Sequence, residues 1–170
     1  RDLVPEKKKK LSYADVITGI ILGLGLGYIC ILGIQYIWIY PVVTGTISME
    51  PTIIPGTRLT VNRLAWKKSL QRGDIIFIKH PEDDSLMLLR IIGLPGDRIE
   101  IKGGRVFVNT SELSTDQERE IQKKSPLNYD LKPFIVPDGK IFLLGDNRPL
   151  ALDSRQLGSL SMDLIHGKIL

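Results

Sequence analysis

The pattern of apolar and polar positions divides the chain into two parts. From about Ala14 to Val43 nearly every residue is apolar, and no charge follows Asp15 within that stretch. A helix needs about 20 apolar residues to cross the hydrocarbon core of a bilayer, so the stretch is long enough even for a tilted helix. Beyond it, apolar residues come in short runs separated by turn residues, which is typical of β-strands. The pattern predicts a transmembrane helix over residues 14–43 and a β-rich domain over residues 44–170.

Short apolar runs place the strands of the second part. We expect strands at Arg58–Leu64, Asp74–Lys79, Leu86–Ile92, Asp97–Ile101, Val106–Asn109, Ile141–Leu144 and from Lys168 onward. The turn residues of Pro81–Ser85 and the pair Gly103–Gly104 indicate two hairpins. Residues 111–133 are polar and lack a period, so we expect a partly mobile surface excursion with a short helix at Thr115–Lys124. Together these elements predict a small, mostly antiparallel β domain with bent, barrel-like sheets.

The residues that flank the apolar stretch predict its orientation. Lys7–Lys10 precede it directly, and lysines at this place stay on the cytoplasmic side of a membrane. Tyr36, Trp38 and Tyr40 lie at the other end, where an aromatic belt is expected. A cleavable signal peptide has a much shorter apolar core, and a buried core helix of this length is unusual. We therefore expect an uncleaved signal anchor, with residues 1–13 in the cytoplasm and the β domain outside the cell membrane.

Composition excludes some classes of function. The formal net charge is +4, but outside the lysine cluster basic residues are scattered among acids. Aromatic residues make up 6% of the chain, so a nucleic-acid partner is not expected. Cys30 is the single cysteine and lies in the apolar stretch, which excludes an intrachain disulfide. Neither a metal nor a cofactor is expected.

Three motifs in the second part carry the candidate chemistry. They are ISMEPT at Ile47–Thr52, LLRIIGLPGD at Leu88–Asp97 and GDNRPLALDSRQLG at Gly145–Gly158. In this order, behind one apolar N-terminal stretch, they resemble the bacterial type I signal peptidases. The resemblance implies a membrane-anchored serine protease that removes signal peptides from exported proteins. It also implies a β-rich fold whose active-site edge rests on the membrane, and it covers most of the chain except residues 111–133.

The same resemblance implies the roles of three residues at the reacting centre. Ser48 matches the nucleophile. The general base of the family is a lysine directly before the R-[IV]-I-G-L-P-G-D run, and that position is Leu89 here. A serine hydroxyl is a weak nucleophile until a base takes its proton, and leucine has no titratable group. The serine that hydrogen-bonds the family's lysine is replaced by Ala151. The paired replacement indicates a site that has stopped using a base.

Further site residues follow from the motifs. The N–H of Ser48 and the hydroxyl of Thr46 match the two oxyanion donors of the family. The candidate substrate-binding residues are Ile47, Met49, Pro51 and Leu88. The candidate site-bracing residues are Asp146, Arg148, Ala151, Asp153, Ser154 and Arg155. A set of apolar residues around Ser48 would form either a rim that dips into the lipid interface or simply part of the core, namely Ile47, Met49, Ile53, Ile54 and Trp66.

Three other residues are alternative bases. Lys79 and His80 lie across the predicted hairpin from Leu89. If Leu89 pairs near Phe77, then Lys79 is a diagonal neighbour or farther, roughly 7 Å or more away. A long side chain would bridge that distance only from the correct face. His166 has less support than either.

Three functions remain open. The chain is a working signal peptidase with an unusual base or feeble activity, a pseudoprotease, or a membrane-tethered β module without a peptide groove. A pseudoprotease would hold exported substrates, as signal-peptidase-like proteins do in pilus assembly in Gram-positive bacteria. Loss of the base costs on the order of a millionfold in kcat, which favours this second function, whereas retention of Ser48 favours the first. The expected partners are signal peptides or exported proteins, pilins among them, and membrane lipid.

Overall fold

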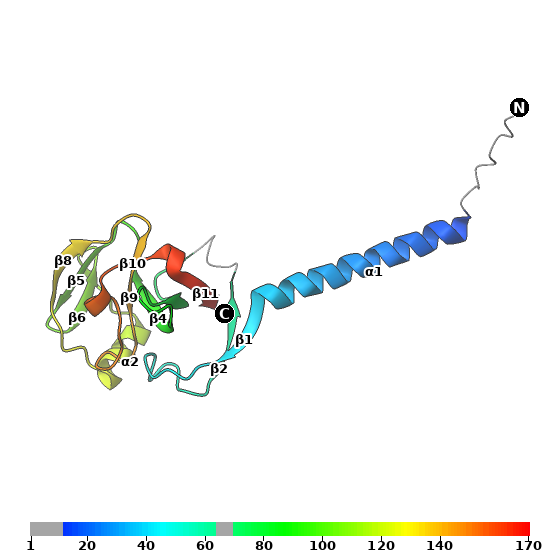
Figure 1. Ribbon diagram of the computed structural model, residues 1–170. Coiled ribbons are helices and arrows are strands. Elements are labelled where there is room, and N and C mark those ends of the chain that lie inside the picture. Colours follow the sequence, from blue (N-terminus) through cyan, green and yellow to red (C-terminus); the bar gives the residue numbers. More distant parts are fainter. Residues whose placement is uncertain (1–11, 64–69) are drawn as a thin grey trace, which may run out of the picture. The chain divides into compact units, whose positions relative to one another are not determined.

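The computed structural model describes residues 12–63 and 70–170, which form two units (Figure 1). The first unit ends at Ile37 and the second runs from Trp38 to Leu170. The predicted lysine cluster Lys7–Lys10 and the rim residue Trp66 lie outside the described residues. The side chains of residues 34–38 are also outside the description, so two members of the expected aromatic belt are not placed.

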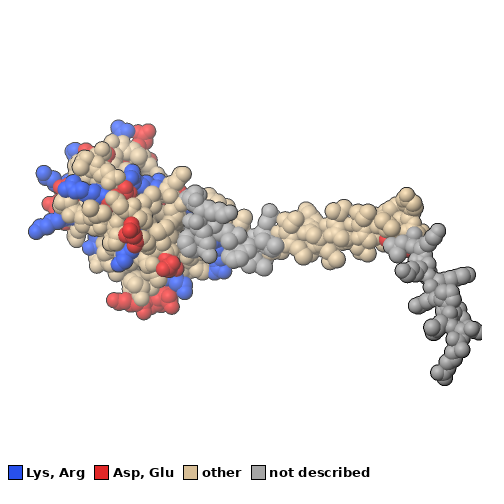
Figure 2. Space-filling model, turned by 90° about the horizontal axis from the view of Figure 1, so that it is seen from above, with Lys and Arg blue, Asp and Glu red and all other residues tan. Residues whose placement is uncertain are grey.

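The described part of the first unit belongs to one helix, α1 (Tyr13–Trp38, 26 residues), whose last residue falls in the second unit. Within it, Tyr13–Gly33 is long and apolar enough to cross a membrane by length and composition. A helix that is apolar on all sides lacks a polar face for water. Figure 2 shows charged side chains of both signs spread over the second unit, whereas the described atoms of α1 are almost all uncharged. The helix fits a single-pass membrane anchor.

The helix ends before the predicted boundary at Val43. Ile39–Val43 forms strand β1, which pairs with β2 (Arg58–Asn62) in antiparallel register. Pro41 lies within β1. Proline lacks an N–H and disfavours a helix interior, but an edge strand tolerates it. The apolar stretch is therefore divided between the helix α1 and the edge strand β1, which begins where the helix ends.

The second unit contains two sheets of antiparallel strands. The larger has the order β1-β2-β11-β3-β4-β9-β10, and the smaller has the order β7-β6-β5-β8. The remaining strands of the larger sheet are β3 (Ile75–Lys79), β4 (Leu86–Gly93), β9 (Lys140–Leu144), β10 (Leu160–Ser161) and β11 (Ile165–Ile169). Those of the smaller sheet are β5 (Arg98–Lys102), β6 (Arg105–Val108), β7 (Ser111–Glu112) and β8 (Leu131–Ile135). The predicted mostly antiparallel β class is confirmed.

Three apolar clusters fill the interior. One joins the two sheets, with Ile99 and Ile101 of β5 packed against Phe142 and Leu144 of β9. Phe134 of β8 meets Phe142 edge to face, with 5.4 Å between ring centroids. The other two clusters lie on opposite faces of β4, because successive residues of a strand point to opposite sides. Leu88 belongs to one of them and Leu89 to the other.

Most of residues 111–133 lie at the surface, as expected, but the segment contains regular structure and a few buried side chains. They contain α2 (Asp116–Lys124), close to the predicted helix, with Thr115 as its N-cap and a hydrogen bond of 3.2 Å from Glu118 N to Thr115 Oγ1. Glu118 and Ile121 of α2 are buried. Two short helical elements lie nearer the C-terminus. They are α3 (Ser154–Leu157), within the third motif, and the 3₁₀ helix η2 (Met162–Leu164), after it. The buried contacts of residues 111–133 could not be read from the sequence, because the few apolar residues there have no obvious period.

Candidate active site

Ser48 lies in the loop between β1 and β2, which we call the Ser48 loop (residues 44–57). Its Oγ donates a hydrogen bond of 2.7 Å to the carbonyl oxygen of Leu88 in β4. Thr46 Oγ1 donates to Ser48 Oγ at 3.0 Å, and Ser48 N donates to Thr46 Oγ1 at 3.1 Å. A carbonyl oxygen accepts a hydrogen bond but does not take up a proton at neutral pH. In this arrangement the two expected oxyanion donors bond within the loop: the N–H of Ser48 donates to Thr46 Oγ1, and the hydroxyl of Thr46 donates to Ser48 Oγ.

Leu89, the position that the family resemblance assigns to the base, lies in an apolar part of the core. Leu89 has 0% exposure and packs with Ile76, Ile91 and Leu143. It is opposite Ile76 of β3 in the register of the two strands. Charged groups are strongly disfavoured at such a place unless they are paired or neutral. The position therefore suits the apolar side chain of leucine, which can neither accept nor donate a proton.

Gly145 is the point where the three motifs meet. A methyl group placed on its Cα would lie 2.2 Å from Ala151 Cβ, 2.7 Å from the Ser48 carbonyl oxygen and 3.6 Å from Leu89 Cδ2. Only glycine fits at this position without displacing the backbone of the Ser48 loop. The tertiary structure thus brings together Ser48, Leu89 and Ala151, the residues that match the nucleophile, the base and the partner of the base.

The third motif holds the Ser48 loop through Asn147. Its backbone N–H donates to the Ser48 carbonyl at 2.9 Å, and its Nδ2 donates to the Ile47 carbonyl at 3.1 Å. The neighbouring Asp146 binds Arg90 of β4 with both carboxylate oxygens, Oδ1 at 2.9 Å from Nε and Oδ2 at 2.5 Å from Nη2. Such two-pronged pairs are the strongest and most directional ion pairs. Arg90 was not singled out from the sequence, although it directly follows Leu89.

Arg148 points into the interior and binds the segment that carries α2. Its Nη2 donates to Glu118 Oε2 at 2.8 Å, and its backbone N–H donates to Ser125 Oγ at 2.9 Å. The side chain of Arg148 has 0% exposure, and within the described part of the chain its Nε and Nη1 have no hydrogen-bond partner. Sequence reasoning missed Glu118, because nothing in a polar helix marks one carboxylate as the partner of a distant arginine.

The remaining bracing residues hold the backbone of the third motif. Asp153 accepts from Gly145 N at 3.0 Å and from Arg155 Nε at 2.8 Å, and it also caps α3. Arg155 Nη2 donates to the Ala151 carbonyl at 3.2 Å. Ser154 Oγ accepts from Leu143 N at 2.9 Å. Each of these contacts fixes either the turn at Gly145 or the strand that leads into it.

The expected substrate-binding residues divide by burial. Met49 and Leu88 are both 0% exposed and lie with Ile53 in one core cluster. Their side chains are therefore core, which corrects the expectation that they meet a peptide directly. Ile47, at 46% exposure, and Pro51 are exposed. The apolar rim is divided in the same way, because Ile54 is exposed whereas Met49 and Ile53 are buried.

Two further apolar side chains are exposed on the third motif. Leu150 is 66% exposed and Leu152 is 48% exposed. They follow the turn at Asn147, which is hydrogen-bonded to the Ser48 loop. They flank the buried Ala151, so the alternation of Leu150, Ala151 and Leu152 is the sequence signal that could have found them.

The alternative bases lie in other contacts. Leu89 pairs with Ile76, next to Phe77 as expected, and Lys79 is opposite Leu86. Because residues 76 and 79 are an odd number apart on one strand, Lys79 points to the face opposite Leu89. Its Nζ lies 3.5 Å from Asp84 Oδ1. The second candidate, His80, lies in the hairpin turn, where its Nδ1 is 3.2 Å from Asp83 Oδ1.

His166 of β11 is engaged elsewhere. Its Nε2 lies 2.7 Å from Arg63 Nη2, so the neutral ring accepts a hydrogen bond from the guanidinium. Burial chiefly lowers the pKa of His166, and the positive charges of Arg63 and Lys79 lower it further. In the described ranges 12–63 and 70–170, Ser48 Oγ hydrogen-bonds only to a hydroxyl and a carbonyl. Among the same residues no group of three or more His, Cys, Asp or Glu side chains could hold a metal ion.

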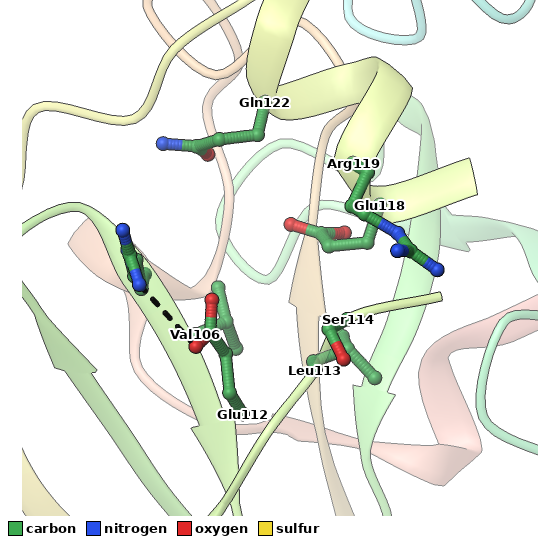
Figure 3. A pocket seen from close by; sticks show the side chains of 8 residues that line it. Val106, Glu112, Leu113, Ser114, Glu118, Arg119 and Gln122 are labelled. Carbon is green, nitrogen blue, oxygen red and sulfur yellow. Dashed lines mark hydrogen bonds and ion pairs between the residues drawn. The ribbon is translucent and has the colours of Figure 1, made fainter. Parts of the chain in front are cut away.

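Cavities lie on both flanks of α2. One of about 280 Å³ lies between α2 and the Ser48 loop, where Pro51 and Thr52 form one side. Another of about 250 Å³ lies between α2 and β6, with Glu118 and Gln122 reaching into it (Figure 3). Arg105 and Glu112 also line this cavity and form an ion pair of 3.5 Å. The first cavity directly adjoins the residues of the candidate site.

Comparisons with known proteins agree on one family. The family model described as Signal peptidase, peptidase S26 matches residues 17–170. Signal peptidase I P of Bacillus subtilis subsp. natto is 35% identical over 167 residues, which cover 94% of this chain and 88% of that protein. Signal peptidase IB of Staphylococcus aureus strain N315 is 33% identical over 136 residues, which cover 72% of this chain and 71% of that protein. The crystal structure of a signal peptidase I from Enterococcus faecalis V583 superposes with a TM-score of 0.52 at 30% identity, covering 61% of this chain and 98% of that one.

Proposed function

Because this chain belongs to the bacterial type I signal peptidase family, peptidase S26, we propose that it binds signal peptides of exported proteins and cleaves them weakly or not at all. It acts at the cell membrane in secretion or pilus assembly, anchored by α1 with its N-terminus in the cytoplasm. The observation that carries the proposal is the environment of Leu89. A fully buried leucine fills the slot of the base, and the Ser48 hydroxyl is hydrogen-bonded to a carbonyl.

The chemistry of the hydroxyl explains why cleavage would be slow. For Ser48 Oγ to attack a peptide carbonyl, its proton must move to a base in the transition state. Its present acceptor, the carbonyl of Leu88, does not supply that step. Loss of the base in a serine protease costs on the order of a millionfold in kcat, which removes turnover on a physiological timescale.

The fixed geometry of the Ser48 loop supports a binding role. Asn147 holds the carbonyls of both Ile47 and Ser48, so the loop is preorganised. Preorganisation lowers the entropy lost on binding, and it is of use to a protein that holds a peptide even when it does not cut it. The buried core of Met49 and Leu88 lies beneath this surface and supports it.

The alternative is an active signal peptidase that uses Ser48 with a non-standard base. The contact between the hydroxyls of Thr46 and Ser48 favours it, since a site without turnover has no chemical need for either group. Against it, Lys79, His80 and His166 are engaged in other contacts. The two functions differ in whether removal of the Ser48 hydroxyl lowers the rate of signal-peptide cleavage.

The test uses the full chain in detergent with signal peptides that carry Ala-x-Ala. We expect crosslinks near Ser48 and in β4, little cleavage, and the same residual rate in Ser48→Ala. A rapid cleavage that Ser48→Ala abolishes would establish the active enzyme instead. Equal crosslinking by scrambled peptides would favour a β module without a peptide groove.

A further inference from the structure

The cavity between the Ser48 loop and α2 joins the candidate peptide surface to a segment outside the three motifs. Pro51 and Thr52, three and four residues after Ser48, form one side of it. The other side is formed by α2 residues Gln117, Glu120, Ile121 and Lys124. A peptide bound along the Ser48 loop would therefore have α2 beside it.

The position of α2 is fixed by the motifs on which the site depends. Arg90, the residue after Leu89, donates a hydrogen bond of 3.3 Å from its Nη1 to Gln117 Oε1. Arg148 binds Glu118 through its side chain and Ser125 through its backbone N–H. Since Glu118 and Arg148 are both buried, separating them would leave an uncompensated charge in the interior. The wall that α2 presents to the cavity is thus preorganised.

Glu120 and Lys124 determine the charge of this wall. Lys124 Nζ lies 2.6 Å from Glu120 Oε1, and the two side chains are 55% and 64% exposed. An ion pair so exposed is weak, so either charge is available to an incoming group. Gln117 adds an amide, and Pro51 and Thr52 on the other side carry no charge. The wall suits a polar side chain better than an apolar one, which would desolvate these groups without replacing their hydrogen bonds.

We propose that this cavity is a specificity subsite that takes one polar or charged side chain of the bound peptide, with Glu120 and Lys124 setting the preference for charge. The inference rests on the proposed function, because it requires a peptide along the Ser48 loop. It concerns which peptides bind and does not depend on whether the bound peptide is cleaved.

The test measures binding of fluorescent Ala-x-Ala signal peptides to the full chain in detergent by anisotropy. Residues on either side of the Ala-x-Ala segment are changed one at a time to Lys, Glu, Gln or Leu. We expect one position, or two adjacent ones, at which the wild type prefers Gln to Leu. There, Lys124→Glu should tighten the Lys peptide and weaken the Glu peptide by about threefold each, and Glu120→Lys should do the reverse. Added salt should shrink both effects.

Lys123→Glu is the matched control, since it makes the same change of charge one residue away at an exposed position that does not line the cavity. It should shift the affinities less than Lys124→Glu does. Equal shifts in the two variants, or no responsive position in peptides that the wild type binds, would overturn the subsite alone. If the wild type binds none of the Ala-x-Ala peptides, the proposed function fails and the subsite with it. Thermal unfolding of each variant establishes that it is folded, and Glu120→Lys gives an independent reading.

Discussion

Single residues decide whether the reacting centre can work. The Ser48 carbonyl oxygen, Leu89 Cδ2 and Ala151 Cβ all lie within 4 Å of the point where a Cβ on Gly145 would stand, so the three motif positions are neighbours. Under the proposed function, Leu89 and Ala151 stand where the base and its partner would be. Both side chains are buried, and neither brings a hydroxyl or an amine that would be left without a hydrogen bond in the interior. Under the proposed function, such side chains therefore suit the buried position but offer no acceptor for the Ser48 proton.

Restoring the two side chains tests this account at the residue scale. Ala151→Ser alone should give little gain in signal-peptide cleavage, Leu89→Lys some gain, and both together the largest. The amine would be buried among apolar side chains, so a loss of several kcal/mol of stability is expected unless it is neutral or hydrogen-bonded. That same burial would lower the pKa of a lysine toward the range of a general base. The measurement is the cleavage rate in detergent.

Two controls make the restoration decisive. Leu89→Met supplies an unbranched apolar side chain like the stem of lysine but no amine, so it should give no gain. Ser48→Ala in each background should remove any gain. A wild type that already cleaves as fast as the double variant, in a manner dependent on Ser48, would mean that another base exists. A folded but inert double variant would mean that the groove has diverged at further positions.

At the scale of elements, α2 is held by a buried ion pair that links it to the third motif. Arg148 has 0% side-chain exposure and lacks partners for Nε and Nη1 among the described residues. Within residues 12–63 and 70–170, Glu118 is the carboxylate that pairs with its charge. The helix is therefore tied to the motif beside the Ser48 loop.

We expect Glu118→Ala to lower the free energy of unfolding by about 3–5 kcal/mol, because it leaves a buried arginine uncompensated. Glu120→Ala, two residues on along the same helix, removes an exposed partner of Lys124 and should change stability little. Denaturant unfolding of the two variants makes the comparison. Similar losses in both would contradict the assignment of Glu118 as the anchor of α2.

The junction of β2 and β11 carries a pH-sensitive contact. His166 accepts a hydrogen bond from Arg63, whose guanidinium lies 5.2 Å from the centre of the Tyr40 ring. The pKa of His166 is lowered by burial and by the charges of Arg63 and Lys79. The unfolded chain then binds a proton more readily than the folded one, so stability is fully present above the ordinary histidine pKa of about 6.5. It should be lost as the pH falls toward the lowered value.

His166→Gln tests this contact, because an amide oxygen still accepts from Arg63 but does not titrate. Thermal unfolding from pH 7.5 to pH 5 should show a smaller drop in Tm for the variant than for the wild type. Identical pH profiles would exclude His166 as the source. Burial raises the pKa of Asp97, but hydrogen bonds from Arg72, Leu94 and Asn109 outweigh it and lower the pKa overall. Asp97 should therefore not contribute to the change between pH 7.5 and pH 5.

At the scale of the whole molecule, the chain separates an apolar helix from a β-rich unit of mixed charge. The helix is long enough to span a bilayer, and the lysines that precede it predict a cytoplasmic N-terminus. Protease added outside intact spheroplasts should therefore digest the β-rich unit. If the β-rich unit were protected in intact spheroplasts and digested only after lysis, the predicted topology would be wrong.

Local patterns in the sequence were sufficient for the features that depend on neighbouring residues. The length of the apolar stretch, most of the strands, the helix after Thr115 and the identity of the residues at positions 48, 89 and 151 can all be read from the printed chain. Only the tertiary structure decided that Ile39–Val43 is a strand, since a short apolar run becomes one when a partner such as β2 is present. It likewise decided that Met49 and Leu88 are core, that Glu118 meets Arg148, and that α2 lies beside Pro51 and Thr52. These features join residues far apart in sequence, and such pairings follow from how the sheets close around a shared core rather than from any local period.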